Sequence, residues 1–385
     1  MLRQNFLKQY SLIIIALFSC SCGQSENYKM IVSKVSHHQI LIDTSYVEIK
    51  IDSNKHLFEY KASSSTDNGI FCGFNPNSNS LDFFDLFAGR ELAQTKVRSN
   101  KRDAIKGCAI INPDSILLLS SEKILLVNKV GEIKKDIPIN ETSKDLFFKT
   151  NYIFEPERAK NFQYIPSINK IIATSLSSKG SEHKNAFNLS PVTQISIEDK
   201  PVFKSIPLSW SNLYKENFYG FFIKSFVSFD GSNIITSFPI EPNIYVHNIK
   251  NKKDTVFGGY PNFKNVKSPL AEPLDIKDHF NDDKKLKNYL ESISYGKVIP
   301  SVKGEMYFRV MSMGLSGKDR ENHDFQKRKL YLIIYDNNFD IVKTLSLNDQ
   351  SYVVEGAFAT EKGLFFPCPN SAGTLRFKLF TFKIT

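Results

Sequence analysis

The chain repeats one local unit, in which an apolar strand-like run is followed by a short polar turn and a second run. Phenylalanine (32) and tyrosine (16) are abundant, and runs of Val, Ile, Phe and Tyr between Asn, Asp, Gly and Ser are typical of antiparallel strands. Five runs open such a unit, at 81–86, 124–128, 193–197, 243–248 and 331–336. Their turns centre on Gly89, Gly131, Asp199, Asn251 and Asn338. The repeat predicts an all-β fold.

The spacing of these turns indicates a β-propeller. The centres lie 42, 68, 52 and 87 residues apart. The shortest interval matches a four-stranded propeller blade, which takes about 40–50 residues, and the longer intervals require insertions. A last strand, Leu375–Ile384, has no turn after it and would complete a blade begun near the N-terminus. We predict six four-stranded blades within residues 37–385, with seven also compatible with the spacing.

One segment, residues 261–295, departs from the strand pattern. Between Asp278 and Ile293 the apolar residues follow helical spacing, with Phe280, Leu286 and Leu290 on one face. We predict a helical insertion across one face of the ring. Loops on a rigid scaffold often carry function, so this insertion is the first candidate for specificity. A packing role fits the pattern equally well.

The first 19 residues have the layout of a bacterial lipoprotein signal peptide. Arg3 and Lys8 precede a short apolar run, 12–18, which is far below the roughly 20 apolar residues that a membrane-spanning helix needs. Cys20 follows a small residue and is the predicted lipid-accepting cysteine, with Cys22 as the alternative. An ordinary signal peptide cut near Ser19 also fits. Residues 20–36 would then be the lipidated cysteine, bearing acyl chains such as palmitate, and a polar tether.

Charge and export together set the expected partners. Removal of residues 1–19 takes away Arg3 and Lys8 and lowers the net charge from +10 to +8. No block of five or more Lys or Arg residues occurs, so no nucleic-acid partner is expected. The predicted address is the bacterial cell envelope, with an outer-membrane lipid anchor favoured and the periplasmic or surface face left open. A glycan, a peptide or a protein is compatible as a further partner.

Three cysteines remain after the signal, Cys72, Cys108 and Cys368, and each lies beside apolar, strand-like residues. No C-x-x-C pair occurs, which removes the signature of zinc ribbons and thioredoxin-like sites. Buried thiols are the favoured interpretation. A Cys72–Cys108 disulfide stays open, because an exported protein meets an oxidising compartment.

At this point the chain resembles the uncharacterised lipoproteins of Bacteroidota-type bacteria known as domain of unknown function 4221. The resemblance rests on Leu17-Phe18-Ser19-Cys20, on the runs 73–86 and 114–131, and on the late hairpin 329–345. It implies a lipid-anchored propeller of about this length, and it brings no catalytic residues with it.

No local catalytic or metal-binding motif emerges from the sequence. The run 336–340 alternates oxygen-bearing residues but lacks the Gly and Glu of a calcium loop, so a hairpin turn is favoured. The run 314–317 falls one residue short of G-x-S-x-G and is predicted to be a flexible loop. The run 228–232 resembles part of a sialidase Asp-box and is predicted to be a turn. We therefore predict no metal and no cofactor.

The candidate ligand-binding residues are Trp210, Tyr214 and Arg309. Trp210 and Tyr214 lie in the densest aromatic stretch and could stack on sugar rings, with core packing as the alternative. Arg309 could enter the channel from an inner strand, with a structural ion pair as the alternative. The predicted function is a lipid-anchored envelope protein with a propeller binding domain. A propeller-type hydrolase or lactonase acting on an extracytoplasmic carbohydrate or ester is the alternative, and enzymatic activity is left undecided.

Overall fold

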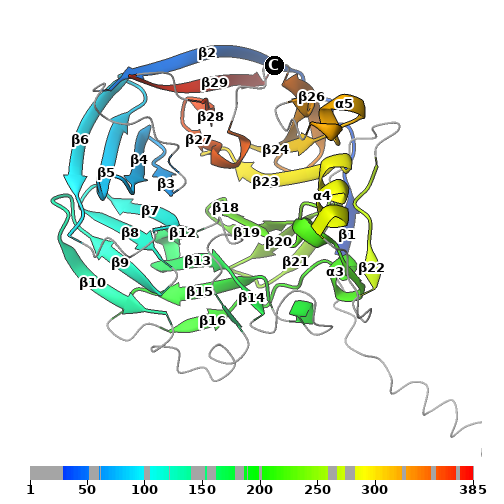
Figure 1. Cartoon of the computed structure of the whole chain (residues 1–385), viewed down its shortest axis with the longest axis horizontal. Coiled ribbons are helices and arrows are strands. Elements are labelled where there is room, and N and C mark those ends of the chain that lie inside the picture. The colour runs from blue at the N-terminus through cyan, green and yellow to red at the C-terminus, as the bar shows by residue number, and fades with distance from the viewer. Residues whose placement is uncertain are drawn as a thin grey trace, which may run out of the picture.

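The ring is built from small twisted antiparallel sheets around a central axis (Figure 1). The computed structural model describes residues 29–51, 60, 62–98, 105–120, 122–139, 152–153, 162–177, 186–188, 190–198, 202–258, 267–273, 282–322, 327–347, 353–369 and 373–384. Within these residues six sheets form the blades, which confirms the six-bladed propeller.

The six blades, A to F, follow the chain, and each has its first strand at the channel. Blade A comprises β3 (Ser63–Ser65), β4 (Ile70–Asn75), β5 (Ser80–Asp85) and β6 (Arg90–Lys96). Blade B comprises β7 (Gly107–Asn112), β8 (Ser115–Leu119), β9 (Lys123–Val127) and β10 (Ile133–Pro138). Blade C comprises β12 (Phe162–Ile165), β13 (Lys170–Thr174), β15 (Val192–Ser196) and β16 (Phe203–Ser205). Blade D comprises β18 (Phe226–Phe229), β19 (Asn233–Ser237), β20 (Ile244–Asn248) and β21 (Asp254–Gly258), with β1 (Lys29–Val32) parallel to β21 at its outer edge. Blade E comprises β23 (Ser294–Pro300), β24 (Met306–Ser312), β25 (Leu330–Asp336) and β26 (Ile341–Leu347). Blade F comprises β27 (Phe358–Thr360), β28 (Gly363–Pro367), β29 (Thr374–Ile384) and β2 (Ile40–Lys50).

The five predicted hairpins are the same part of five different blades, namely the connection from the third strand to the fourth. Four of these turns share one device, a side-chain oxygen at the strand end that accepts backbone N–H groups of the turn. Asp85 Oδ1 accepts from Phe87 and Ala88, and Asn128 Oδ1 accepts from Val130 and Glu132. Asn248 and Asp336 act in the same way in blades D and E. The run 336–340 is therefore the hairpin turn that the sequence predicts. In blade C, Asp199 lies outside the described residues.

The ring is closed by the two ends of the chain. β2 pairs with β29 in an antiparallel register that runs from Ile40 opposite Ile384 to Lys50 opposite Thr374. The last strand thus completes a blade whose outer strand comes from the N-terminal side, as predicted. Part of the segment that the sequence analysis assigns to the tether already contacts the ring. β1 pairs with β21 of blade D, and Val35 forms a bridge with Ile341 of blade E.

Alternating side chains form one apolar cluster between each pair of neighbouring blades. In β8, Ile116 and Leu118 pack toward blade A, whereas Leu117 and Leu119 pack toward blade C. This period of two is what a strand covered on both faces requires. The core of the protein is therefore a circle of six interfaces rather than one centre.

The predicted helical insertion contains α4 (Asp282–Glu291), with Leu290 and the following Ile293 buried. The predicted C-terminal limit of the insertion, residue 295, is too late, because Ser294 and Tyr295 already belong to the inner strand β23. Phe280 lies outside the described residues. No described helix combines the length and apolarity needed to cross a membrane.

Candidate functional site

The two faces of the ring carry different structure. Because each blade is an antiparallel meander, connections between strands one and two and between strands three and four lie on one face, here called the turn face. Connections between strands two and three, and from one blade to the next, lie on the other face. Nearly all of the additional elements fall on this second face, which points to it as the functional one.

We define the cap as the additional elements on that face beside blades D and E. They are α3 (Asn212–Glu216), β17 (Asn217–Phe218), η3 (Gly220–Phe222), β22 (Glu272–Pro273), α4 and α5 (Gly317–Glu321). Two other insertions, β14 (Leu176–Ser177) with η2 (Ala186–Asn188) and β11 (Tyr152–Ile153), lie on the same face beside blade C. By contrast, the turn face adds the single 3-10 turn η1 (Pro166–Ile168) among the described residues.

The helix α4 is the centre of the cap, and Asn288 fastens it to the segment before β22. Asn288 Oδ1 accepts from the backbone N–H of Leu270 at 2.8 Å, and its Nδ2 donates to the Leu270 carbonyl at 3.3 Å. Ser292 Oγ donates to the same Oδ1 at 3.0 Å. The amide thus pairs with Leu270 as a neighbouring strand would, which explains a polar side chain buried on the apolar side of the helix.

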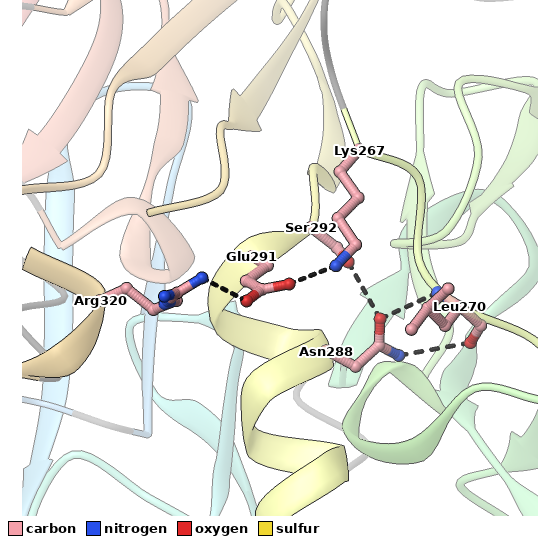
Figure 2. Close-up of polar contacts among 6 residues, drawn as sticks. All are labelled: Lys267, Leu270, Asn288, Glu291, Ser292 and Arg320. Atoms are coloured by element: carbon pink, nitrogen blue, oxygen red, sulfur yellow. Dashed lines mark hydrogen bonds and ion pairs between the residues drawn. The ribbon is translucent and has the colours of Figure 1, made fainter. Parts of the chain in front are cut away.

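Glu291 ties three cap segments together at the last turn of α4. Figure 2 shows its carboxylate between Lys267 and Arg320, which come from opposite sides of the helix. Arg320 Nη1 donates to Oε1 at 2.6 Å, and Lys267 Nζ contacts Oε2. Partial burial acts to raise the pKa of Glu291, but these cations outweigh it and hold the pKa below its ordinary value.

The loop that follows β24 packs closely against α4, so the flexible loop predicted at 314–317 is corrected. Leu315 donates its N–H to the Leu290 carbonyl at 2.7 Å. A Cβ on Gly314 would lie 1.9 Å from the Glu291 carbonyl oxygen, so the approach leaves room for glycine alone. Arg328, farther along this loop, donates to the Tyr289 carbonyl and stacks on the Tyr289 ring.

Trp210 and Tyr214 are buried below the cap, within an aromatic cluster. Trp210 is 2% exposed, and its ring lies 5.0 Å from Phe187 and 5.2 Å from Tyr214 between ring centres. The Tyr214 hydroxyl donates to the Phe222 carbonyl at 2.6 Å. Both rings face other aromatic rings, so they support the cap from within and present no face to a ligand in this structure.

Arg309 is also buried, and it binds backbone carbonyls instead of the carboxylate expected of a structural ion pair. Its guanidinium donates to the carbonyls of Phe238 (2.9 Å), Pro242 (2.6 Å) and Gly296 (3.0 Å), and at longer range to those of Glu241 and Asn243. The side chain therefore fixes the loop 238–243 of blade D to the inner strand of blade E. The three predicted residues thus converge on this loop, because Trp210 and Tyr214 pack against Phe238.

The loop held by Arg309 carries a buried carboxylate, Glu241, which is 5% exposed. Burial raises the pKa of Glu241, while hydrogen bonds from Ser211, Tyr245 and Asn243 partly offset that effect. Each oxygen has a donor within the loop or beside it, so Glu241 is a satisfied structural acid.

Lys297 is a candidate in the channel wall that sequence reasoning missed. The pairing of β23 with β24 shifts register between Tyr295 and Val298, which creates a bulge at Gly296 and Lys297 in an innermost strand. Tight packing around the side chain lowers the pKa of Lys297 to about 8, although the residue keeps partial contact with solvent. No partner for its amine occurs among the residues that the structure describes. A bulge cannot be recognised in the sequence, since it depends on the partner strand.

Other sequence candidates are placed as follows. Cys72, Cys108 and Cys368 are buried free thiols, as favoured, and no disulfide joins them. A hollow of about 200 Å³ on the turn face, lined in part by His38, Glu305 and Asp336, is smaller than the roughly 300–1,000 Å³ typical of ligand pockets. Among the described residues no group of three or more His, Cys, Asp or Glu side chains could hold a metal ion. Cys20 and Cys22 lie outside the described residues.

Comparison with known proteins places the chain in a family. The model of the family called domain of unknown function DUF4221 matches residues 99–343, well over half of the chain. The chain belongs to this family. The match confirms the resemblance drawn from the sequence, and it spans blades B to D and most of blade E together with the cap.

Solved structures agree with this assignment. A member of the DUF4221 family from Bacteroides vulgatus superposes with a TM-score of 0.70 at 12% identity, covering 91% of this chain and 100% of that one. A protein from Bacteroides fragilis assigned as exported superposes with a TM-score of 0.53 at 10% identity, covering 92% and 100%. At these identities the likeness concerns the fold. No curated protein matches the chain.

Proposed function

We propose that this protein is a lipid-anchored envelope protein whose propeller is a binding module, and that a partner protein docks on the cap. The observation that carries the proposal is the gathering of additional structure on one face of the ring. α3, α4 and α5 lie on one face, whereas the turn face adds only η1 among the described residues.

Exposed apolar side chains on the cap support a protein partner. Leu213 on α3, Phe221 on η3 and Leu270 are 42%, 48% and 49% exposed. Two of them lie beside neighbouring residues of α4, because Leu270 is hydrogen-bonded to Asn288 and Phe221 meets the Tyr289 ring at 6.4 Å. Apolar residues surrounded by charged ones are typical of protein interfaces.

The cap holds this surface in a fixed shape. Glu291, Asn288 and Arg328 fasten α4 to the two neighbouring segments, so the exposed side chains do not have to be ordered on binding. Preorganisation of this kind lowers the entropic cost of association.

A site-specific photocrosslinker tests the docking surface. Benzoylphenylalanine at Phe221 should capture a discrete protein in intact cells, and the substitution Leu270→Asp should abolish that product. Val130, which is 55% exposed in a turn of blade B, is the matched control position. Identical products at Phe221 and Val130, or products insensitive to Leu270→Asp, would count against the cap as a docking surface.

The anchor is supported by the signal-like N-terminus and by the structural likeness to a protein assigned as exported. A clickable fatty acid should label the wild-type chain and the Cys22→Ser variant, and Cys20→Ser should not be labelled. Persistent labelling of Cys20→Ser would show that Cys22 carries the lipid.

A hydrolytic activity on an ester or lactone is the second candidate, and Lys297 is the observation that favours it. An amine with a pKa of about 8 is partly neutral near physiological pH and can act as a base. Turnover of an ester panel that disappears in Lys297→Met, while the melting temperature does not fall, would establish this activity.

A further inference from the structure

The first described residues form a strap, residues 29–41, around the outer circumference of three blades (Figure 1). β1 lies along the outer strand of blade D, from Lys29 opposite Thr255 to Val32 opposite Gly258. At blade E, the Ile341 N–H donates to the Lys34 carbonyl at 2.7 Å, and the Ser36 N–H donates to the Ile341 carbonyl at 2.8 Å. The strap then enters β2, the outer strand of blade F.

The strap is unusually apolar on its exposed side. Five of the twelve large apolar side chains that are exposed among the described residues lie between residues 30 and 41. Met30, Val32, Val35 and Leu41 are 60%, 72%, 76% and 60% exposed, and Ile31 is 36% exposed. Exposed apolar side chains gathered in one segment are unfavourable in water and are a common mark of an interaction surface.

We infer that the strap lies against the lipid surface to which the chain is anchored, so that the ring stands on the edge formed by blades D, E and F. This inference rests on the proposed attachment of lipid at Cys20. The nine residue steps from Cys20 to Lys29 span at most about 30 Å when fully extended. The strap is therefore the described element that lies nearest to the proposed anchor along the chain.

The charges around the strap fit a membrane interface. The exposed Lys34 lies within it, the exposed Lys383 stands opposite Leu41 in the β2–β29 pair, and Lys343 is exposed two residues after Ile341. The acids beside the strap are Asp43, Asp254 and Asp340, together with Glu305 and Asp336, which line a hollow with His38 and Ile40. Asp340 accepts from the Lys34 N–H at 2.6 Å, and Asp254 is paired with His247. Apolar side chains flanked by lysines are the usual composition of interfacial segments.

An edge-on position leaves both faces of the ring open. The cap would project sideways from the membrane instead of being pressed against it, and a partner could reach Leu213, Phe221 and Leu270 from the aqueous side. A second copy of the chain, paired through the free edge of β1, is the rival occupant of the strap.

The test uses the full-length lipidated protein in phospholipid vesicles that contain brominated acyl chains. In Val35→Trp, the new indole should be quenched strongly by the brominated lipid. In the control Val130→Trp it should keep its emission, and the native Trp210 is buried and contributes a constant background. Both positions are exposed, so neither substitution disturbs the interior.

The outcomes separate the strap from its anchor. Equal emission from Val35→Trp and Val130→Trp in a labelled, vesicle-bound protein would overturn the inference and leave the anchor intact. Quenching of the indole in Val35→Trp in a protein that takes no lipid label would refute the attachment of lipid and support contact between the strap and the bilayer. The indole of Val35→Trp could instead be shielded from water in detergent at high protein concentration and escape quenching in vesicles. That result would show that the strap contacts a second copy of the chain and not the lipid.

Discussion

The two faces of the ring are held together in different ways. On the turn face, Asp85, Asn128, Asn248 and Asp336 each accept backbone N–H groups from residues two to four positions ahead. On the opposite face, Glu291 of the cap binds residues 24 and 29 positions away, and Arg309 of blade E binds carbonyls as far as 71 positions away. The turns of the first face are independent of one another, whereas the contacts on the second face join distant segments. A substitution on the turn face should therefore loosen only its own hairpin, whereas one on the opposite face should loosen several segments.

The largest effect is expected from Arg309→Met. The substitution leaves the carbonyls of Phe238, Pro242 and Gly296 without donors in a buried place, and removal of one partner from such a site costs about 3–5 kcal/mol. Urea unfolding measures the loss. Arg90→Met removes the same side chain from an exposed position at the blade A turn and is the control. Equal losses in the two variants would show that the carbonyl contacts of Arg309 contribute little to stability.

A smaller effect, about 1–2 kcal/mol, is expected from Glu291→Gln, because Lys267 and Arg320 then lose a charged acceptor at a partly buried site. Hydrogen exchange should accelerate in α4 and leave the blades unchanged. Glu321→Gln, at an exposed position, should change neither. Uniform acceleration throughout the ring would mean that Glu291 does not act within the cap.

The same carboxylate gives the cap a pH dependence. The pKa of Glu291 is lowered in the folded protein. The stabilisation that its ion pairs provide is therefore complete above the ordinary pKa of 4.5 and is lost as the pH falls through the lowered value. Protection of α4 should therefore decline in acid in the wild type, and the contribution of this residue should be absent in Glu291→Gln.

Lys297→Met should stabilise the protein by about 1–2 kcal/mol at pH 7, the full shift being discounted because the amine keeps contact with water. The folded protein disfavours the charged amine, so the penalty is present below about pH 8 and disappears as the pH rises toward the ordinary value of 10.5. Chemical unfolding at pH 7 and pH 10 measures the difference, with Lys343→Met as the exposed control. A variant that is destabilised at both values would show that the amine has a partner.

The smallest effect is expected on the turn face. Asn128→Ala removes the acceptor for two turn N–H groups that solvent can still reach, and should cost about 0.5–1 kcal/mol. Exchange should rise in the β9–β10 hairpin and nowhere else. Val130→Ala in the same turn is the neutral control. A loss that spreads to other blades would remove the distinction between the faces.

The same distinction explains what the sequence could predict. The hairpins were recognisable because Asp85 and Asn128 bind backbone N–H groups of their own turns. The packing of β8 was recognisable because its residues face the two neighbouring blades in alternation. Ring closure was also visible, since the strand at 375–384 had no turn after it.

The cap was recognisable only as a break in the pattern. Helical spacing located α4 approximately, but the pairing of Asn288 with Leu270 and the meeting of Lys267 with Arg320 depend on segments that are distant in the chain. The aromatic run around Trp210 and Tyr214 was noticed for its composition, yet composition does not distinguish a buried ring from an exposed one. The Arg309 carbonyl contacts arise from the meeting of two blades, which no local pattern encodes.

The shared blade F also sets the order in which the molecule can be completed. β2 is made before the strands of blades A to E, whereas its partner β29 is made after them. The ring therefore cannot close until β29 has been made, and the backbone edge of β2 stays unpaired until then. Contacts between distant parts of a chain form slowly. A protein of this design depends on its own last strand for its assembly, and a short C-terminal truncation should leave an open, aggregation-prone arc in place of a slightly smaller ring.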